Sequence, residues 1–132
     1  MKKLTIVLFL FASTALATPA KQDADAWLLE IRQAKDNSQD ALFINNLNNR
    51  IKLLSTINKL DAQAEKLFDE SWDGSHACQS TPKMIAGYLQ GLNTLLTAPA
   101  RNTNINSTWI LKMSWEGAQW YAECRDKIDL LK

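Results

Sequence analysis

Cysteine and histidine, the side chains most used as nucleophiles and transition-metal ligands, are scarce in this sequence. It holds two cysteines, Cys78 and Cys124, and one histidine, His76. The motif Cys-x-x-Cys-His, which attaches haem covalently, is absent. His76 has acidic neighbours within residues 69–73, but a single histidine with carboxylates from a loop makes a weak site for Zn²⁺ or Cu²⁺. The sequence therefore predicts no metal, no cofactor and no catalytic residue.

The two cysteines are better suited to a disulfide than to catalysis. An even pair of cysteines in an exported chain favours a bridge. We therefore expect Cys78 and Cys124 to be joined, the alternative being two buried thiols. A bridge over so long a loop stabilises a domain by roughly 4 kcal/mol in the chain-entropy model.

Arg50 and Lys59 are the cationic pair that we single out for an anionic substrate. Arg50 lies in a segment, residues 47–54, that resembles the helix bearing a substrate-binding arginine in exported chorismate mutases. The resemblance implies a small helical enzyme and gives Arg50 that role. It ends at Asp61, where that family has a lysine, and the basic-acidic loop motif that follows in the family is absent.

A second likeness concerns Cys78 and the helical segment at residues 87–92. This order of a cysteine and then a helix is similar to that in periplasmic immunity proteins of bacterial toxin systems, which include small disulfide-bonded helical domains. The likeness implies a protein that binds another protein.

Tryptophan is abundant, with five residues in the chain, three of them between residues 109 and 120. A helical spacing places most apolar residues of this region on one arc, which we expect to be core: Trp109, Met113, Gly117, Trp120, Tyr121, Cys124, Ile128 and Leu131. Trp115 falls outside that arc, beside Leu111, Ala118 and Ala122. Two explanations stay open for this second face: the helix expected at 40–72 covers it, or it is exposed and contacts a partner or a second copy.

The elements that must position these residues are helices, because apolar residues recur at spacings of three and four. We expect helices over Lys21–Lys35, Asp40–Trp72, from about Ser80 to Thr97, and from Ser107 or Thr108 to Leu131. The fold class is therefore all-α, a small bundle of about four helices, the third and fourth forming an antiparallel hairpin. Measured from the tip of this hairpin, the cysteines lie about 28 Å and about 24 Å along their helices, so a bridge can staple it.

Capping residues define the expected ends of these helices. Gly74 suits a left-handed position after the second helix, and Thr81 and Pro82 suit the start of the third.

Gly87 and Gly91 share a face of the third helix, which predicts close approach of another element. The loops expected at residues 73–78 and 98–106 are natural contact elements.

Residues 1–17 have the three parts of a secretory signal peptide. Lys2 and Lys3 form a basic start, residues 4–12 are apolar, and residues 15–17 supply small side chains for cleavage. The apolar run is about half of the roughly 20 residues that span a bilayer. The sequence predicts a protein of the periplasm or the extracellular space, with one domain over residues 18–132 and no membrane attachment after cleavage.

The charge balance argues against nucleic acid or an anionic membrane as a partner. The chain has 15 basic and 14 acidic residues, and losing Lys2 and Lys3 takes the basic count to 13, for a net charge of about −1. Binding to either polyanion needs a concentrated positive field.

Scarce catalytic groups and surplus aromatic surface favour a function in protein–protein binding. We expect a periplasmic protein that engages another protein or a second copy of itself, as an inhibitor, immunity protein or chaperone-like factor does. The expected contact residues are Trp115, Leu111, His76, Asp73 and Arg101. The alternatives are the small enzyme described above and a structural component of an envelope assembly.

Overall fold

The structure is a computed structural model that describes residues 18–97 and 103–132. Within these ranges the chain forms helices and turns, without a strand. The expected signal peptide at residues 1–17 and the expected contact residue Arg101 lie outside the described residues. Among the helices of the described residues, none combines the length and apolar character needed to cross a bilayer.

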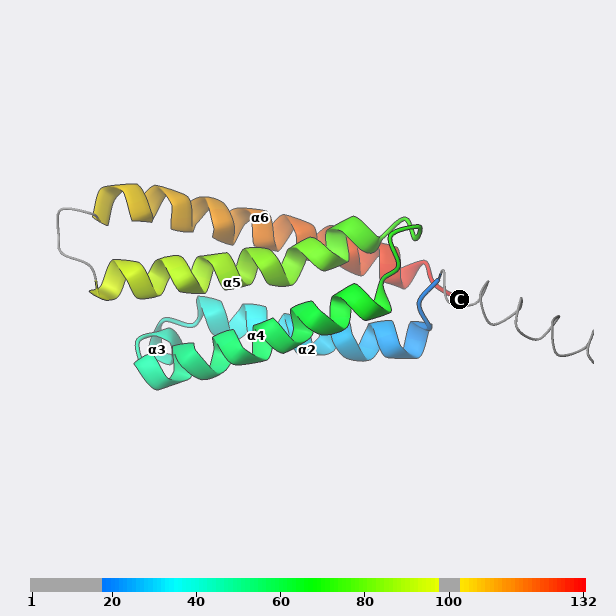
Figure 1. The fold of residues 1–132 in the computed structure, drawn as a ribbon, viewed down its shortest axis with the longest axis horizontal. Helices are drawn as coiled ribbons and strands as arrows, with labels where there is room; N and C mark the ends of the chain where they lie inside the picture. The colour runs from blue at the N-terminus through cyan, green and yellow to red at the C-terminus, as the bar shows by residue number, and fades with distance from the viewer. Residues whose placement is uncertain (1–17, 98–102) are drawn as a thin grey trace, which may run out of the picture.

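Two antiparallel helix pairs lie side by side in the bundle (Figure 1). The first pair is α2 (Lys21–Gln39) and α4 (Leu47–Leu67), joined through the short helix α3 (Ala41–Ile44). The second pair is α5 (Ser75–Thr97) and α6 (Thr103–Asp129). These helices confirm the predicted small all-α bundle, with the two C-terminal helices as an antiparallel hairpin.

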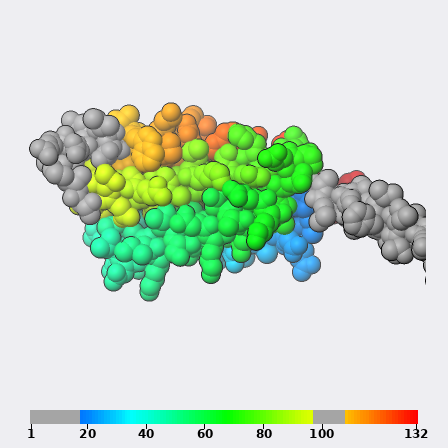
Figure 2. All heavy atoms as spheres, viewed as in Figure 1, coloured from blue at the N-terminus to red at the C-terminus, as the bar shows by residue number. Residues whose placement is uncertain are grey.

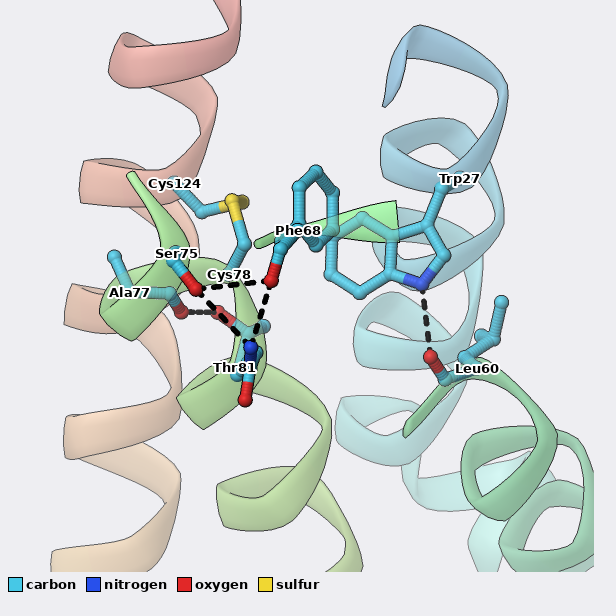
Figure 3. Close-up of a disulfide and its surroundings, with 9 residues drawn as sticks. Trp27, Leu60, Phe68, Ser75, Ala77, Cys78, Thr81 and Cys124 are labelled. Atoms are coloured by element: carbon cyan, nitrogen blue, oxygen red, sulfur yellow. Dashed lines mark hydrogen bonds between the residues drawn. A yellow bond between two sulfur atoms is a disulfide. The ribbon is translucent and has the colours of Figure 1, made fainter. Parts of the chain in front are cut away.

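The predicted disulfide is present and staples this hairpin. Cys78 of α5 and Cys124 of α6 are joined, both are fully buried, and their Cα atoms lie 4.8 Å apart (Figure 3). Because disulfides persist in oxidising surroundings, the bridge indicates a compartment outside the cytosol.

The core forms where apolar stripes of the helices meet around this disulfide. Trp27 of α2 is buried, and its indole Nε1 donates to the carbonyl of Leu60 in α4 at 2.9 Å (Figure 3). Phe68 packs edge-on against Trp27, with ring centres 4.9 Å apart, and stacks on Trp72 at 5.4 Å. Further buried members of this core are Ala24, Ile31, Ala34, Leu53, Ile57, Ala64, Ala77, Ile85, Leu89, Tyr121 and Ile128.

α2 is longer than predicted, since it continues past Lys35 to Gln39. Polar residues in this segment suggested a break. Ser38 is instead buried, and its Oγ donates to the carbonyl of Lys35 at 2.6 Å. A hydroxyl that bonds back to its own helix is compatible with continued helix, so polarity alone did not end it.

The single helix predicted over residues 40–72 is wrong at its start. The Asp40 carboxylate accepts from the backbone N–H groups of Leu42 at 3.0 Å and Phe43 at 3.3 Å, which caps α3. The Asn46 side chain then accepts from the N–H of Asn49 at 3.2 Å and caps α4. Asp and Asn side chains that bind backbone groups start new helices, and apolar periodicity does not report this.

The predicted end at Trp72 is also wrong, because α4 stops at Leu67. In the turn that follows, the Asp69 carboxylate accepts from the hydroxyl of Ser71 at 2.7 Å and from its N–H at 2.9 Å. These hydrogen bonds to Ser71 hold the pKa of Asp69 below its ordinary value. A local turn built by one side chain therefore separates α4 from α5.

Gly74 does not adopt the predicted left-handed conformation, since no described glycine has a positive φ. Its lack of a side chain matters for packing instead. A Cβ on Gly74 would overlap the ring of Trp72 and would lie 2.7 Å from the Cβ of Lys127. Glycine is therefore required for the turn to approach α6.

α5 begins at Ser75, so the predicted start at Thr81 and Pro82 is wrong. Thr81 is fully buried inside the helix, and its Oγ1 donates to the carbonyl of Ala77 at 2.8 Å. Pro82 also lies inside the helix, where it cannot donate a backbone hydrogen bond. Burial of Ala77 and Cys78 against the rest of the core offsets the cost of that proline, about 3 kcal/mol.

α6 begins at Thr103, earlier than the predicted Ser107 or Thr108. Asn and Thr, which dominate this stretch, are weak helix formers but do not break a helix. Residues 103–106 of the loop predicted at 98–106 therefore belong to α6, and residues 98–102 lie outside the described residues.

The two glycines of α5 confirm the predicted close approach of another element, which is α6. A Cβ on Gly91 would lie 2.6 Å from the ring of Trp109 and 2.8 Å from Cγ1 of Ile110. A Cβ on Gly87 would lie 3.3 Å from the sulfur of Met113. Both glycines therefore receive side chains of α6.

Candidate functional site

Four apolar residues lie along the outer side of α6 at spacings of four, three and four: Leu111, Trp115, Ala118 and Ala122. We call this row the outer seam. Leu111 is 71% exposed and Trp115 is 64% exposed. Ala118 is exposed and Ala122 is half-buried. At about 100° per residue the row stays within roughly 60° of arc, which is the narrow stripe used in helix–helix packing.

The outer seam is exposed although α2 borders it at Ala118, which lines a small cavity with Lys35 and Gln39. α6 packs against α5 and α2, whereas α4 packs against α5, α2 and α3. The explanation in which the second helix covers Trp115 is therefore wrong. Figure 2 shows α6, in gold to orange, along an outer edge of the molecule beside α5.

The inner side of α6 largely matches the predicted core stripe. Gly117, Tyr121, Cys124 and Ile128 are buried, and Met113, Trp120 and Leu131 are partly buried. Trp109 is the exception, with 42% exposure. It lies at the hairpin tip against Gly91, which offers no side chain to cover it.

Exposed apolar side chains also occur on α3 and the start of α4. Leu47 and Ile51 of α4 are 51% and 54% exposed, and Leu42 of α3 is 89% exposed. The buried face of α4 starts instead with Arg50 and Leu53. Leu47 and Ile51 lie about 60° to 100° from that face around the helix, which an apolar count alone does not reveal.

His76 and Asp73 do not join the outer seam. His76 is exposed in the first turn of α5, not in the predicted loop, and its ring packs edge-on against Trp120 at 4.8 Å. Asp73 forms an ion pair with Lys127 of α6, and the hydrogen bond and charge of Asp73 raise the pKa of Lys127. Trp120 lies about 140° from Trp115 around α6, so these contact residues belong to two separate surfaces.

Arg50 and Lys59 do not share a site either. Arg50 is 4% exposed, and it donates from Nε to Asn93 Oδ1 and from Nη1 to the carbonyl of Ile44, both at 2.6 Å. Lys59 is exposed on the opposite face of α4, since nine residues rotate a helix by about 180°. The arrangement makes Arg50 a residue that ties α4 to α5, and it assembles no anion site from this pair.

This assignment predicts that Arg50→Ala lowers the free energy of unfolding by about 2 to 3 kcal/mol, because two partly buried acceptors lose a charged donor. Urea denaturation measures the effect. Lys59→Ala is the matched control on the same helix, with an expected change below about 0.5 kcal/mol. A stability loss for Arg50→Ala no larger than for Lys59→Ala would contradict the structural role.

A groove of mixed charge, which the sequence reasoning missed, runs between α2 and α4. Its volume is about 410 Å³, and Glu30 of α2 and Lys52 and Lys59 of α4 line it above the apolar floor of Ala34 and Leu60. The signal for it in the sequence is the seven-residue spacing of the lysines, which places them on one helix face. Its charged lining residues, two lysines and one glutamate, are mixed in sign with an excess of one positive charge.

Within residues 18–97 and 103–132 no three His, Cys, Asp or Glu side chains come together as a metal site. Both cysteines are used in the bridge. The exposure of Leu111 and Trp115 makes the outer seam a candidate surface for molecular recognition. No protein-family model, curated protein or solved structure matches this chain.

Proposed function

We propose that this chain is an exported helical protein that acts by binding a protein partner through the outer seam of α6. The observation that carries the proposal is the exposure of Leu111 and Trp115 on one continuous face, at 71% and 64%. Large exposed apolar side chains that lie together favour an interface, and tryptophan is enriched among residues that dominate binding energy.

The rest of the molecule supports a scaffold for that face. α6 is held rigidly by the disulfide and by close packing over the glycines of α5. A rigid helix face loses little conformational entropy on binding. Activities of this type include those of inhibitors, toxin-immunity proteins and chaperone-like factors.

Export belongs to the same proposal. Residues 1–17 would direct secretion, and the domain would act in the periplasm. The disulfide and the signal-like order of basic, apolar and small residues support this.

The test is capture of partners by the tagged protein, produced with its own N-terminus and recovered from the envelope fraction, with Thr18 as the expected first residue. Trp115→Ala and Leu111→Ala are expected to weaken retention of a specific partner at least tenfold, because they remove central apolar contacts. Quantitative mass spectrometry of the bound fraction measures retention.

Leu42→Ala is the matched control, since Leu42 is also an exposed leucine, at 89%, but lies on α3. It is expected to retain the same partner as the wild type. Equal retention by the wild type, Trp115→Ala, Leu111→Ala and Leu42→Ala would refute binding through the outer seam.

A further inference from the structure

We propose that the partner on the outer seam is a second copy of this chain, packed with its α6 antiparallel to the first. This inference rests on the proposed function, because both use the same face. It specifies the occupant and the register, and each can be tested separately.

The first argument is the order of side-chain sizes along the seam. The N-terminal half carries the large residues Leu111 and Trp115, and the C-terminal half carries the small residues Ala118 and Ala122. Spacings of four, three and four match the seam of two helices that pack along their length. A row of side chains that runs from large to small fits against the same row running in the opposite direction.

An antiparallel pair uses this gradient on both chains at once. About a two-fold axis, Trp115 packs over the partner's Ala118, and Leu111 packs over the partner's Ala122. Both pairs share a midpoint between residues 116 and 117, so one register satisfies them together. A parallel pair would instead crowd Trp115 against the partner's Trp115 and leave the alanines facing a gap. Two-fold symmetry is also the commonest form of self-association.

The second argument is charge complementarity in that register. Lys112 and Glu123 lie on the same flank of α6. At about 100° per residue, their directions around the helix axis differ by only about 20°. The side chain of Lys112 is 65% exposed, with Nζ 4.0 Å from Oε1 of Glu116, and Glu123 is exposed. Along the helix axis, the point midway between Lys112 and Glu123 lies about 1.5 Å from the midpoint shared by the apolar pairs. The same register therefore suits the charged pair. Antiparallel packing therefore brings Lys112 near the partner's Glu123, and the reverse.

The interface is short, so the association is weak. Four apolar and two charged side chains from each copy are fewer than the roughly 20 residues of a standard interface. We expect a dissociation constant on the order of 10 μM. The dimer forms where the local concentration of the protein exceeds this value, as it can in a narrow compartment.

Sedimentation velocity of the purified, disulfide-bonded protein tests the inference between about 1 and 500 μM, a range that brackets the expected constant. The wild type is expected to shift from monomer to dimer. Trp115→Ala removes the large member of each pair, and Ala118→Trp sets tryptophan against tryptophan. Each is expected to weaken the dimer at least tenfold.

The double variant Trp115→Ala/Ala118→Trp exchanges the large and small positions. In the antiparallel register it recreates the same pair, so its dissociation constant is expected to return to within about threefold of the wild type. Lys112→Glu is expected to weaken the dimer, and Lys112→Glu/Glu123→Lys to restore it. Circular dichroism melts check that each variant stays folded, as expected for exposed positions.

A protein that stays monomeric at 500 μM would overturn the inference. A dimer that Trp115→Ala leaves intact would also overturn it. So would a double variant Trp115→Ala/Ala118→Trp whose dimer is no tighter than that of the single variants. A monomer that still retains a different protein through Trp115 would overturn this inference alone and leave the proposed function standing. A monomer that retains no partner would overturn both.

Discussion

Reduction of the Cys78–Cys124 disulfide is expected to lower the melting temperature of the protein by roughly 15 °C. The bridge joins residues 46 apart in the chain. In the chain-entropy model a loop of that length contributes about 4 kcal/mol by restricting the unfolded chain. For a domain of this size each kcal/mol moves the melting temperature by about 4 °C. Thermal melts with and without a phosphine reductant measure the shift.

The variant Cys78→Ala/Cys124→Ala is the control for this experiment. Both sulfur atoms are buried between α5 and α6, so removing them also costs packing. The variant is expected to melt at or below the temperature of the reduced wild type, and the reductant is expected to leave its melt unchanged. Equal melting temperatures for the oxidised and reduced wild type would contradict a stabilising bridge.

Phe68→Ala is expected to lower the free energy of unfolding by about 3 to 5 kcal/mol. Phe68 is fully buried, and its ring contacts the rings of Trp27 and Trp72. Removing the ring leaves a cavity where α2, α4 and the turn before α5 meet. A loss of this size is a large part of the 5–15 kcal/mol that stabilises a typical domain. Urea denaturation, with an unchanged slope, measures it.

Phe68→Leu separates volume from backbone effects at this position. The carbonyl of Phe68 accepts from Ser75 Oγ at 3.0 Å and from Gln79 Nε2 at 2.8 Å, and neither bond depends on the ring. Phe68→Leu keeps those bonds and most of the volume, so a loss of about 1 kcal/mol is expected. If both variants lost the same amount, cavity formation would not be the cause.

The outer seam shows how far periodicity can define a surface. Spacing alone separated Trp115 from the core arc and grouped it with Leu111, Ala118 and Ala122. It gave the angle between the two faces of α6 but not the positions of the neighbouring helices. Because α4 packs on α2 and α5 rather than on α6, the second face is exposed.

Arg50 shows the opposite outcome for a candidate site residue. The resemblance of residues 47–54 to a substrate-binding helix implied an anionic ligand for Arg50. In the structure Arg50 donates to Asn93 of α5 and to the carbonyl of Ile44. Asn93 lies far from Arg50 in the sequence, so no local pattern could have paired them.

Residue types and their spacing were enough to predict an all-helical fold, the pairing of Cys78 with Cys124 and the hairpin that they staple, because these follow from local periodicity and simple lengths. The tertiary structure decided the rest. Burial of Ala77 and Cys78 keeps Pro82 inside α5, close packing of Gly74 against Lys127 fits the turn before α5 to α6, and the packing of α4 leaves Trp115 exposed. Each of these outcomes depends on groups distant in the chain, whose packing energy exceeds the local preference that the sequence displays.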